Sequence, residues 1–321
     1  MSSWLVTGGA GYIGAHVVKA FRDLGEPVVV VDDLSTGEAS RVGDAPLVVG
    51  SVADRELLTD TLRTHAVDGI VHIAAKKQVG ESVADPLRYY RENVGGLISL
   101  LEAAADCGVG SFVFSSSSSV YGMPDVELVT EEVRGIPLSP YGETKLIGEW
   151  MTRAIATATD LQVISLRYFN AAGAACVELG DPGVFNLIPL ALRALTGGTP
   201  PTIFGDDYPT PDGTCIRDYV HVADIADAHV AAVRHLSGGG RSSAYNVGRG
   251  QGSSVREILA EVAAVTGIDI PATIAARRPG DPARVTASVE AIHRDLGWQA
   301  RYDLREIVQS AWEAWQHRPP G

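Results

Sequence analysis

The segment that most constrains the fold is a glycine-rich turn near the start of the chain. Residues 4–6 form a short apolar run typical of a buried strand, and an amphipathic helical pattern follows it. Between the two, Gly8, Gly11 and Gly14 recur every three residues. Glycine is needed where a chain turns sharply, where backbone approaches a pyrophosphate and where a helix packs closely on a strand. The pattern therefore predicts a strand, turn and helix that bind the phosphates of a dinucleotide.

An acidic residue after the next apolar run indicates which dinucleotide binds. Asp32 ends the predicted strand at residues 28–31, 18 positions beyond Gly14. A carboxylate at this place accepts hydrogen bonds from a ribose diol and repels a 2′-phosphate, which favours NAD over NADP. Asp33 is interpreted as a turn residue or a second ribose contact.

The same alternation of strands and helices continues through the first half of the chain. It predicts an α/β fold, a Rossmann-type doubly wound parallel sheet followed by a smaller α/β substrate domain. We expect an NAD-binding domain over residues 1–169 and a substrate-binding domain over 170–321, with segments around 218–248 returning to the first. Strands are predicted at 47–49, 70–74, 112–114, 163–166, 202–204 and 245–247, and helices at 55–62, 89–105, 141–158, 187–195, 224–236, 289–296 and 304–315. A further helix is predicted to begin at Ser254, which has capping-box spacing with Glu257, and to end near Gly267.

Composition narrows the function classes. The chain has 321 residues, 45% of them hydrophobic, and a net charge of −13, which disfavours nucleic acid or an anionic membrane as the main partner. It shows no basic leader and no apolar run long enough to span a bilayer, so we expect a cytoplasmic protein. The three scattered cysteines are expected to be free thiols, and the eight histidines lack ligand spacing, so no metal is expected.

A tyrosine and a lysine lie four residues apart in the predicted helix 141–158. Tyr141 and Lys145 would share one helix face, with Ser139 as the cap and Pro140 in the first turn. A phenol ionises near pH ~10, so a tyrosine that acts as a base needs a nearby cation, which Lys145 can supply. Taken alone, the pair is also typical of an ordinary amphipathic helix.

A run of serines could complete this catalytic group. Residues 115–119 are all serine and follow the predicted strand 112–114, at the sheet edge where ligands bind. Such a run is often only a solvated turn. Together with the helix that begins near Ser139, it makes an assembly of Ser117, Tyr141 and Lys145 plausible.

Several longer segments are similar to those of one known family. The chain resembles the extended short-chain dehydrogenase/reductases over nearly its whole length, and within them the UDP-glucose 4-epimerases. The segments that carry the resemblance are residues 7–14 (TGGAGYIG), 114–117 (FSSS), 120–122 (VYG), 139–142 (SPYG), 166–170 (LRYFN), 204–210 (FGDDYPT) and 217–222 (RDYVHV).

The resemblance implies a reaction and a role for each catalytic residue. Tyr141 would take a proton from the 4-hydroxyl of a UDP-sugar while NAD accepts hydride from C4, and the transient 4-keto sugar would be reduced on its other face. Ser117 would hydrogen-bond the 4-oxygen. Lys145 would bind the nicotinamide ribose and stabilise the phenolate.

The resemblance also implies the cofactor contacts. Lys77 matches a lysine that reaches the cofactor, whereas Lys76 is interpreted as a surface residue. Asn93 matches an asparagine beside the nicotinamide, although an asparagine inside a helix could equally make a structural hydrogen bond. The implied NAD-binding residues are Gly8, Gly11, Tyr12, Ile13, Gly14, Asp32, Lys77, Asn93 and Tyr168.

A UDP-sugar brings about two negative charges that an acidic protein must neutralise locally, preferably with guanidinium groups. Arg217 and the pair Arg277 and Arg278 are the candidates. The resemblance implies that Arg217 and Arg278 hold the diphosphate and that Asp281 binds a ribose hydroxyl. Asn170 and Asn186 would contact the diphosphate and sugar region. Phe204 would lie beside the uracil and Val285 beside the sugar.

Three positions depart from the family pattern. Ser51 replaces an aspartate that commonly holds the adenine amino group, which weakens that contact. Val285 replaces a bulky tyrosine present in some epimerases, so the smaller side chain leaves room for activity on N-acetylated UDP-sugars. The segment 171–183 is shorter than usual, so the loop over the substrate is expected to differ.

Other functions remain open at this stage. A dehydratase needs an additional acid and base, which in the family directly follow the third residue of the serine run. This chain has Ser118 and Ser119 there, and these side chains lack that capability. An epimerase of another UDP-sugar, such as UDP-glucuronate, and a non-catalytic NAD-binding sensor are the alternatives. We also expect a homodimer, formed by the helices predicted at 89–105 and 141–158.

Overall fold

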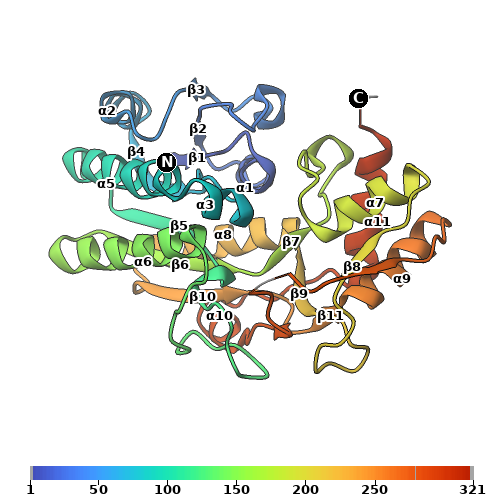
Figure 1. Ribbon diagram of the computed structural model, residues 1–321. Coiled ribbons are helices and arrows are strands. Elements are labelled where there is room, and N and C mark those ends of the chain that lie inside the picture. The colour runs from blue at the N-terminus through green and yellow to red at the C-terminus, as the bar shows by residue number, and fades with distance from the viewer. Residues whose placement is uncertain (1–2, 279, 319–321) are drawn as a thin grey trace.

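The larger part of the molecule is built on a parallel sheet of seven strands. The computed structural model describes residues 3–278 and 280–318, and in this range the strand order is β10-β6-β5-β4-β1-β2-β3 (Figure 1). The order reverses beside β1, which is the doubly wound Rossmann arrangement, so the predicted fold class is confirmed. The strands are β1 (Ser3–Thr7), β2 (Val28–Asp32), β3 (Leu47–Val49), β4 (Val67–His72), β5 (Ser111–Ser117), β6 (Gln162–Tyr168) and β10 (Ser243–Val247).

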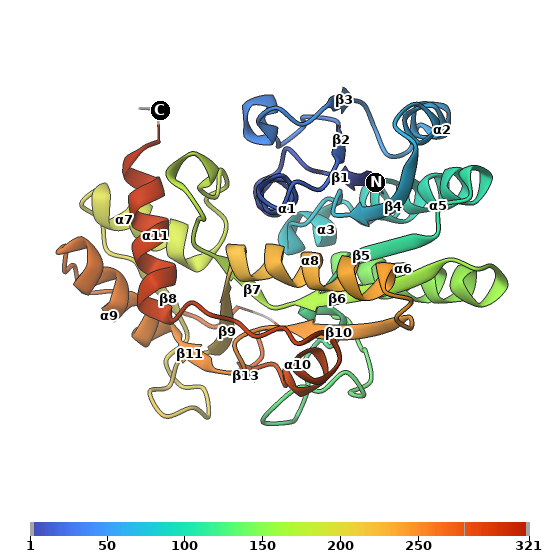
Figure 2. The ribbon, with the colours of Figure 1, turned by 180° about the vertical axis from the view of Figure 1, so that it is seen from behind.

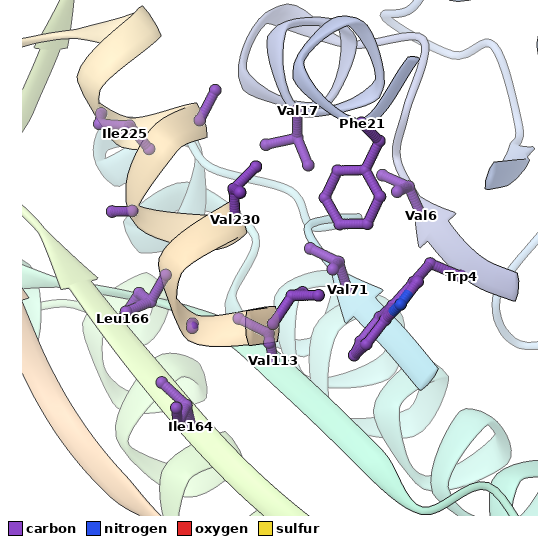
Figure 3. Close-up of a cluster of buried hydrophobic side chains, with 14 of the residues drawn as sticks. Trp4, Val6, Val17, Phe21, Val71, Val113, Ile164, Leu166, Ile225 and Val230 are labelled. Carbon is purple, nitrogen blue, oxygen red and sulfur yellow. The ribbon is translucent and has the colours of Figure 1, made fainter. Parts of the chain in front are cut away.

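Helices cover both faces of this sheet (Figures 1 and 2). Leu5 packs in the core on one face and Val6 in the core on the other, because successive side chains of a strand point in opposite directions. Figure 3 shows the second of these cores, where Phe21 and Val230 lie over the strands. One face carries α1 (Tyr12–Asp23) and α8 (Val222–Ser237); the other carries α2 (Arg55–Thr64), α5 (Gly96–Cys107) and α6 (Pro140–Ala158).

The smaller part contains a four-stranded sheet, a two-stranded sheet and a separate helical core. In the four-stranded sheet, β9 pairs with three short strands. The strands are β7 (Asn170–Ala172), β9 (Ile216–His221), β11 (Gly252–Ser254) and β13 (Arg284–Val285), with β8 (Thr202–Phe204) and β12 (Thr273–Ala275) forming the pair. The helices are α7 (Leu187–Thr196), α9 (Val255–Thr266) and α11 (Leu304–Gln316), while α10 (Glu290–Leu296) lies beside β10.

The chain passes between the two parts more than once. Only Phe169 separates β6 of the large sheet from β7 of the small one. After β9 the chain returns, so that α8 packs on α1 and β10 pairs with β6 at the edge of the large sheet. The division into domains at residue 169 stays a prediction.

The predicted helices are present, with local differences. The helix expected at 89–105 consists of α4 (Pro86–Tyr89), a π-helical turn (Tyr90–Gly95) and α5. A short α3 (Val79–Ala84) precedes it, and 3₁₀ turns occupy Ala39–Val42, Ser118–Val120 and Val177–Leu179. Among the described helices, none is long and apolar enough to cross a membrane.

Two interpretations of strands were incomplete. The first three serines of the run, residues 115–117, do not follow β5 but belong to it: the strand pairs with β6 as far as Ser117, opposite Tyr168, and these three serines are buried. Ser118 and Ser119 begin the 3₁₀ turn after the strand. The sequence also did not predict most of the second sheet. Its strands are two to six residues long and mix polar with apolar side chains, so they lack a clear period.

Candidate active site

The glycine turn brings the start of α1 very close to the end of β1. Gly8 has a positive φ of 72°, and Gly11 N–H donates to the Gly8 carbonyl at 3.2 Å. A Cβ on Gly14 would lie 2.0 Å from the Gly8 oxygen, so no larger residue fits without moving the helix. Tyr12 and Ile13 open α1 beside this turn, where the first N–H groups of the helix have no partner inside it.

Asp32 ends β2 beside this turn. Its Oδ2 accepts a hydrogen bond from Ala10 N–H at 2.9 Å, and its Oδ1 accepts one from Leu34 N–H at 2.8 Å. A carboxylate has about four acceptor positions, so one remains on each oxygen. Two adjacent hydroxyls of a ribose match this arrangement, and the residues around the turn therefore fit NAD.

The two neighbouring lysines differ in exposure, and Lys76 is less exposed than predicted. Lys76 is not a surface residue: its side chain is 17% exposed, donates to Ser35 Oγ at 2.9 Å and lies 3.9 Å from the Asp33 carboxylate. Lys77 is exposed, and its ammonium lies 5.8 Å from the centre of the Tyr12 ring. The correction for Lys76 arises from β2, which brings Asp33 within reach of a loop more than forty residues later.

Asn93 joins two parts of the site. Its Oδ1 accepts from Lys76 N–H at 2.8 Å, while its Nδ2 donates to the Lys76 carbonyl and to Thr144 Oγ1, both at 3.0 Å. The buried amide thus fixes the lysine loop to helix α6. This supports the structural interpretation of Asn93, and its contact with NAD stays a prediction.

Tyr141 and Lys145 lie on the buried face of α6. Ser139 caps the helix by accepting Gly142 N–H at 3.2 Å, and Pro140 occupies its first turn, as predicted. The Lys145 ammonium donates to the Ser115 carbonyl at 2.8 Å and lies 6.0 Å from the centre of the Tyr141 ring. Burial lowers the pKa of Lys145 to about 8.

Ser117 and Tyr168 stand opposite each other at the ends of β5 and β6. Burial raises the pKa of Tyr141, and a hydrogen bond with Ser117 acts in the opposite direction. Burial also raises the pKa of Tyr168, and the nearby Tyr141 raises it further. The sheet therefore brings Ser117, Tyr141, Lys145 and Tyr168 together at its carboxyl edge.

The candidate substrate residues form a second group on the smaller sheets. The Arg217 guanidinium on β9 is paired with the Asp281 carboxylate, with side chains that are 15% and 30% exposed. The Arg278 guanidinium lies 3.9 Å from the centre of the Phe204 ring. Each candidate diphosphate ligand thus already has a partner within the protein.

The remaining substrate candidates are more dispersed. Val285 lies opposite Arg217 in the strand pair β13–β9 and packs with Tyr121 and Phe169. Asn170 begins β7 beside β9, and its side chain is exposed. Asn186 precedes α7 and donates to Asp181 Oδ2 at 3.2 Å.

The loop at 171–183 is held against α1. The Tyr12 hydroxyl donates to the Gly173 carbonyl at 2.5 Å, and His16 Nε2 accepts from Ala175 N–H at 3.0 Å. Arg41 donates to the carbonyl of Leu179 at 3.1 Å and to the next carbonyl at 3.0 Å. The loop is thus fastened to the same helix that begins at the glycine turn.

Sequence reasoning missed three buried charged residues around the site. Glu149 and Arg167 form an ion pair behind Ser116, and Asp218 accepts three backbone N–H groups next to Arg217. A signal for Glu149 existed, because it follows Tyr141 and Lys145 at the same spacing of four.

Ser51, which replaces the aspartate expected from the family pattern, accepts a hydrogen bond from Ala53 N–H at 3.1 Å.

The fold and these side chains are typical of a Rossmann enzyme that depends on a dinucleotide. Comparison with known proteins agrees: the model of the NAD dependent epimerase/dehydratase family matches residues 4–248. A UDP-glucose 4-epimerase of Azospirillum brasilense is 47% identical over 317 residues, covering 96% of this chain and 91% of the relative.

Two solved structures extend the comparison. UDP-glucose 4-epimerase from Stenotrophomonas maltophila, with bound NAD and formylated UDP-arabinopyranose, matches with a TM-score of 0.94 at 41% identity over 98% of both chains. The UDP-Glc/GlcNAc 4-epimerase of Campylobacter jejuni matches with a TM-score of 0.88 at 35% identity, over 99% of this chain and 100% of that one. The chain belongs to the NAD dependent epimerase/dehydratase family.

Proposed function

We propose that the chain is a UDP-glucose 4-epimerase, an isomerase that interconverts UDP-glucose and UDP-galactose with bound NAD. The observation that carries the proposal is the grouping of Ser117, Tyr141 and Lys145 at the same carboxyl edge of the sheet as the glycine turn and Asp32. Relatives of similar sequence over nearly their full length are named UDP-glucose 4-epimerase.

The glycine turn, Asp32 and Lys77 would hold NAD, with its ribose at the Asp32 carboxylate and its pyrophosphate at the start of α1. Bound NAD supplies a reversible hydride acceptor for C4 of the sugar. Lys145 would contact the nicotinamide ribose from below, and Tyr168 would lie beside it.

Tyr141 would act as the general base and then as the general acid. Burial raises the pKa of Tyr141, so the phenol is protonated until positive charge approaches it. Lys145 is partly or largely protonated near neutral pH and supplies part of that charge. Tyr141 would then remove the proton of the 4-hydroxyl, with Ser117 orienting the oxygen, and return it after the transient 4-keto sugar has presented its other face.

We expect Arg217 and Arg278 to leave their partners within the protein when the UDP group binds. Arg217 would turn from Asp281 to the diphosphate, and Arg278 would leave the Phe204 ring, which the uracil would then cover. Asp281, released from Arg217, would accept a ribose hydroxyl. Asn170 and Asn186 would contact the diphosphate and sugar region.

The side chain of Val285 supports a wider substrate range. Valine leaves room beside the sugar where a tyrosine would crowd the 2-substituent, and a relative from Campylobacter jejuni is named for both UDP-Glc and UDP-GlcNAc. The enzyme would therefore also interconvert UDP-GlcNAc and UDP-GalNAc. The absence of N-acetyl turnover at saturating enzyme, with UDP-glucose active, would refute this extension.

A homodimer is the proposed assembly. Leu87, Ile98 and Trp150 are large apolar side chains with 70%, 45% and 52% of their surfaces exposed, and they lie on α4, α5 and α6. Two copies that pair through these helices would bury them. Sedimentation should show a dimer that Trp150→Glu dissociates, and a wild-type monomer at all concentrations would contradict the assembly.

We also propose that the protein works in the cytoplasm. Cys107, Cys176 and Cys215 are all free thiols, as a reducing compartment allows. Fractionation of cells that contain the tagged chain should place it with cytoplasmic proteins.

The decisive experiment is a panel of UDP-hexoses, assayed for inversion at C4 without added cofactor. UDP-glucose and UDP-galactose should interconvert, and the bound nicotinamide should show reduced-form absorbance when a UDP-sugar is added. Turnover of UDP-glucuronate instead of UDP-glucose would show that the protein is an epimerase of another UDP-sugar. NAD binding without turnover or reduction would indicate a sensor.

A further inference from the structure

The buried face of α6 makes three contacts with β5. Tyr141, Lys145 and Glu149 are spaced by four residues and lie above one another on the helix. Each faces one serine of the strand: Lys145 donates to the Ser115 carbonyl at 2.8 Å, and Glu149 Oε1 accepts from Ser116 Oγ at 2.5 Å. Tyr141 lies near Ser117, whose hydroxyl acts to lower the pKa of the phenol. The proposed base therefore belongs to a continuous set of contacts.

Arg167 on β6 completes the last of these contacts. Its Nε donates to Glu149 Oε1 at 2.8 Å and one terminal nitrogen donates to Oε2 at 2.6 Å, a bidentate pair with fixed geometry. The two side chains are only 12% and 9% exposed. The pair therefore holds α6, β5 and β6 at defined separations, just behind the catalytic edge.

The other terminal nitrogen of Arg167 connects this anchor to the proposed sugar site. It donates to the Tyr121 hydroxyl at 2.9 Å and to the Glu131 carbonyl at 3.0 Å. Tyr121 in turn donates to Asn246 Oδ1 at 2.6 Å, and its ring packs in the same cluster as Val285. One guanidinium thus contacts both the element that carries Tyr141 and the residues around Val285.

We infer that Glu149 and Arg167 are positioning residues for the epimerisation: through Ser116 and Tyr121 they set the separation between the Tyr141 base and the sugar site. The inference rests on the proposed function. Burying two charges contributes little net stability even when they pair well, so fixed geometry is the main effect of such a pair. Reaction rates fall steeply when a catalytic group moves by even 1 Å.

Ser116→Ala is the cleanest test, because it detaches Glu149 from β5 without leaving a buried charge unpaired. We expect kcat to fall about tenfold while KM for UDP-glucose stays near the wild-type value, since the shift affects the reacting groups only. The pKa of Tyr141, measured as tyrosinate absorbance against Tyr141→Phe, should rise as its contact with Ser117 weakens. Ser165→Ala, a buried serine on the neighbouring strand β6, is the matched control and should change neither quantity.

A second set of variants separates positioning from stability. Glu149→Gln leaves the Arg167 charge buried and unpaired, so both thermal stability and kcat should fall. Adding Arg167→Gln removes that charge, and we expect stability to recover while kcat stays low. Recovery of kcat together with stability would overturn the inference.

The two proposals can fail separately. If wild-type enzyme interconverts UDP-glucose and UDP-galactose but Ser116→Ala retains its full kcat and an unchanged Tyr141 pKa, the positioning role is wrong and the proposed function stands. If wild-type enzyme turns over no UDP-hexose, the proposed function fails, and the tyrosinate titration still decides whether Ser116 and Glu149 position Tyr141.

Discussion

The two groups of candidate site residues are held in different ways. On the large sheet, Lys145 and Asn93 are buried and bonded to neutral backbone or side-chain atoms, which leaves their positions fixed. On the smaller sheets, Arg217 is paired with a carboxylate and Arg278 is stacked on an aromatic ring. Under the proposed function, the first group is in place before a substrate arrives, whereas the second would change partners.

This difference separates catalysis from binding. Polar groups that are oriented in advance need no reorganisation at the moment of reaction, so changing them should lower kcat. Cations that exchange an internal partner for a diphosphate contribute only the difference between the two interactions, so changing them should mainly raise KM. The following variants test that separation.

Tyr141→Phe should have the largest effect. Without the phenolic hydroxyl the 4-hydroxyl proton has no acceptor, and we expect kcat to fall by about 10³-fold or more. NAD should stay bound, as its absorbance after gel filtration would show. Near-normal turnover would refute the assignment, and Tyr245→Phe, a phenol on β10, provides the control.

Arg217→Ala tests the second group, the candidate diphosphate ligands on the smaller sheets, and should mainly raise KM. Losing a bidentate guanidinium from the diphosphate should raise KM about 100-fold, with a smaller change in kcat. Steady-state kinetics with UDP-glucose measures both. Arg55→Ala removes a cation paired with Asp106 on the exterior and should leave KM unchanged. A fall in kcat with KM preserved would break the distinction between the two groups.

Val285→Tyr should change selectivity more than rate. A tyrosine at this position fills the space beside the sugar, so kcat/KM for UDP-GlcNAc should fall at least about tenfold more than that for UDP-glucose. Parallel assays of both substrates give the ratio. An unchanged ratio would show that residue 285 does not limit the 2-substituent.

Lys145→Met tests how burial affects the catalytic lysine. Above pH ~10.4, the pKa of a lysine in the unfolded chain, the Lys145 amine is neutral in both the folded and the unfolded protein. As the pH falls, this amine is protonated first in the unfolded protein. The folded state therefore loses relative stability until about pH 8, below which the penalty is complete. At pH 7 the variant should be more stable than wild type by about 1–2 kcal/mol, allowing for the lost bond to Ser115. Urea unfolding of nucleotide-free protein should show that the variant is more stable than wild type at pH 7 and that this difference disappears at high pH.

Local sequence patterns predicted the large sheet and its helix ends well. The glycine turn, the helix cap at Ser139 and the capping box of Ser254 with Glu257 are all present, because each depends on residues close together in the chain. The same locality explains why the αβ alternation sufficed to predict the fold class. The roles of the site residues stay predictions.

Features that depend on distant pairing were missed. Lys76 was placed at the surface because its partner Asp33 lies in the loop after β2, far away in the sequence. Glu149 and Arg167 are 18 residues apart, and only the packing of α6 on β6 joins them. The short strands of the four-stranded sheet are stabilised by pairing with adjacent strands, and their own amino-acid composition does not predict a strand.

The single residue between β6 and β7 has a mechanical consequence. Phe169 is buried, and its N–H donates to the Val247 carbonyl at 3.0 Å, so the junction is pinned on the side where the chain returns. We therefore expect this junction to resist hinge motion between the two sheets. If the proposed function holds, we expect a nucleotide sugar to enter and leave by local movement of the segments that carry Phe204 and Arg278, with the overall dimensions of the molecule constant through a catalytic cycle.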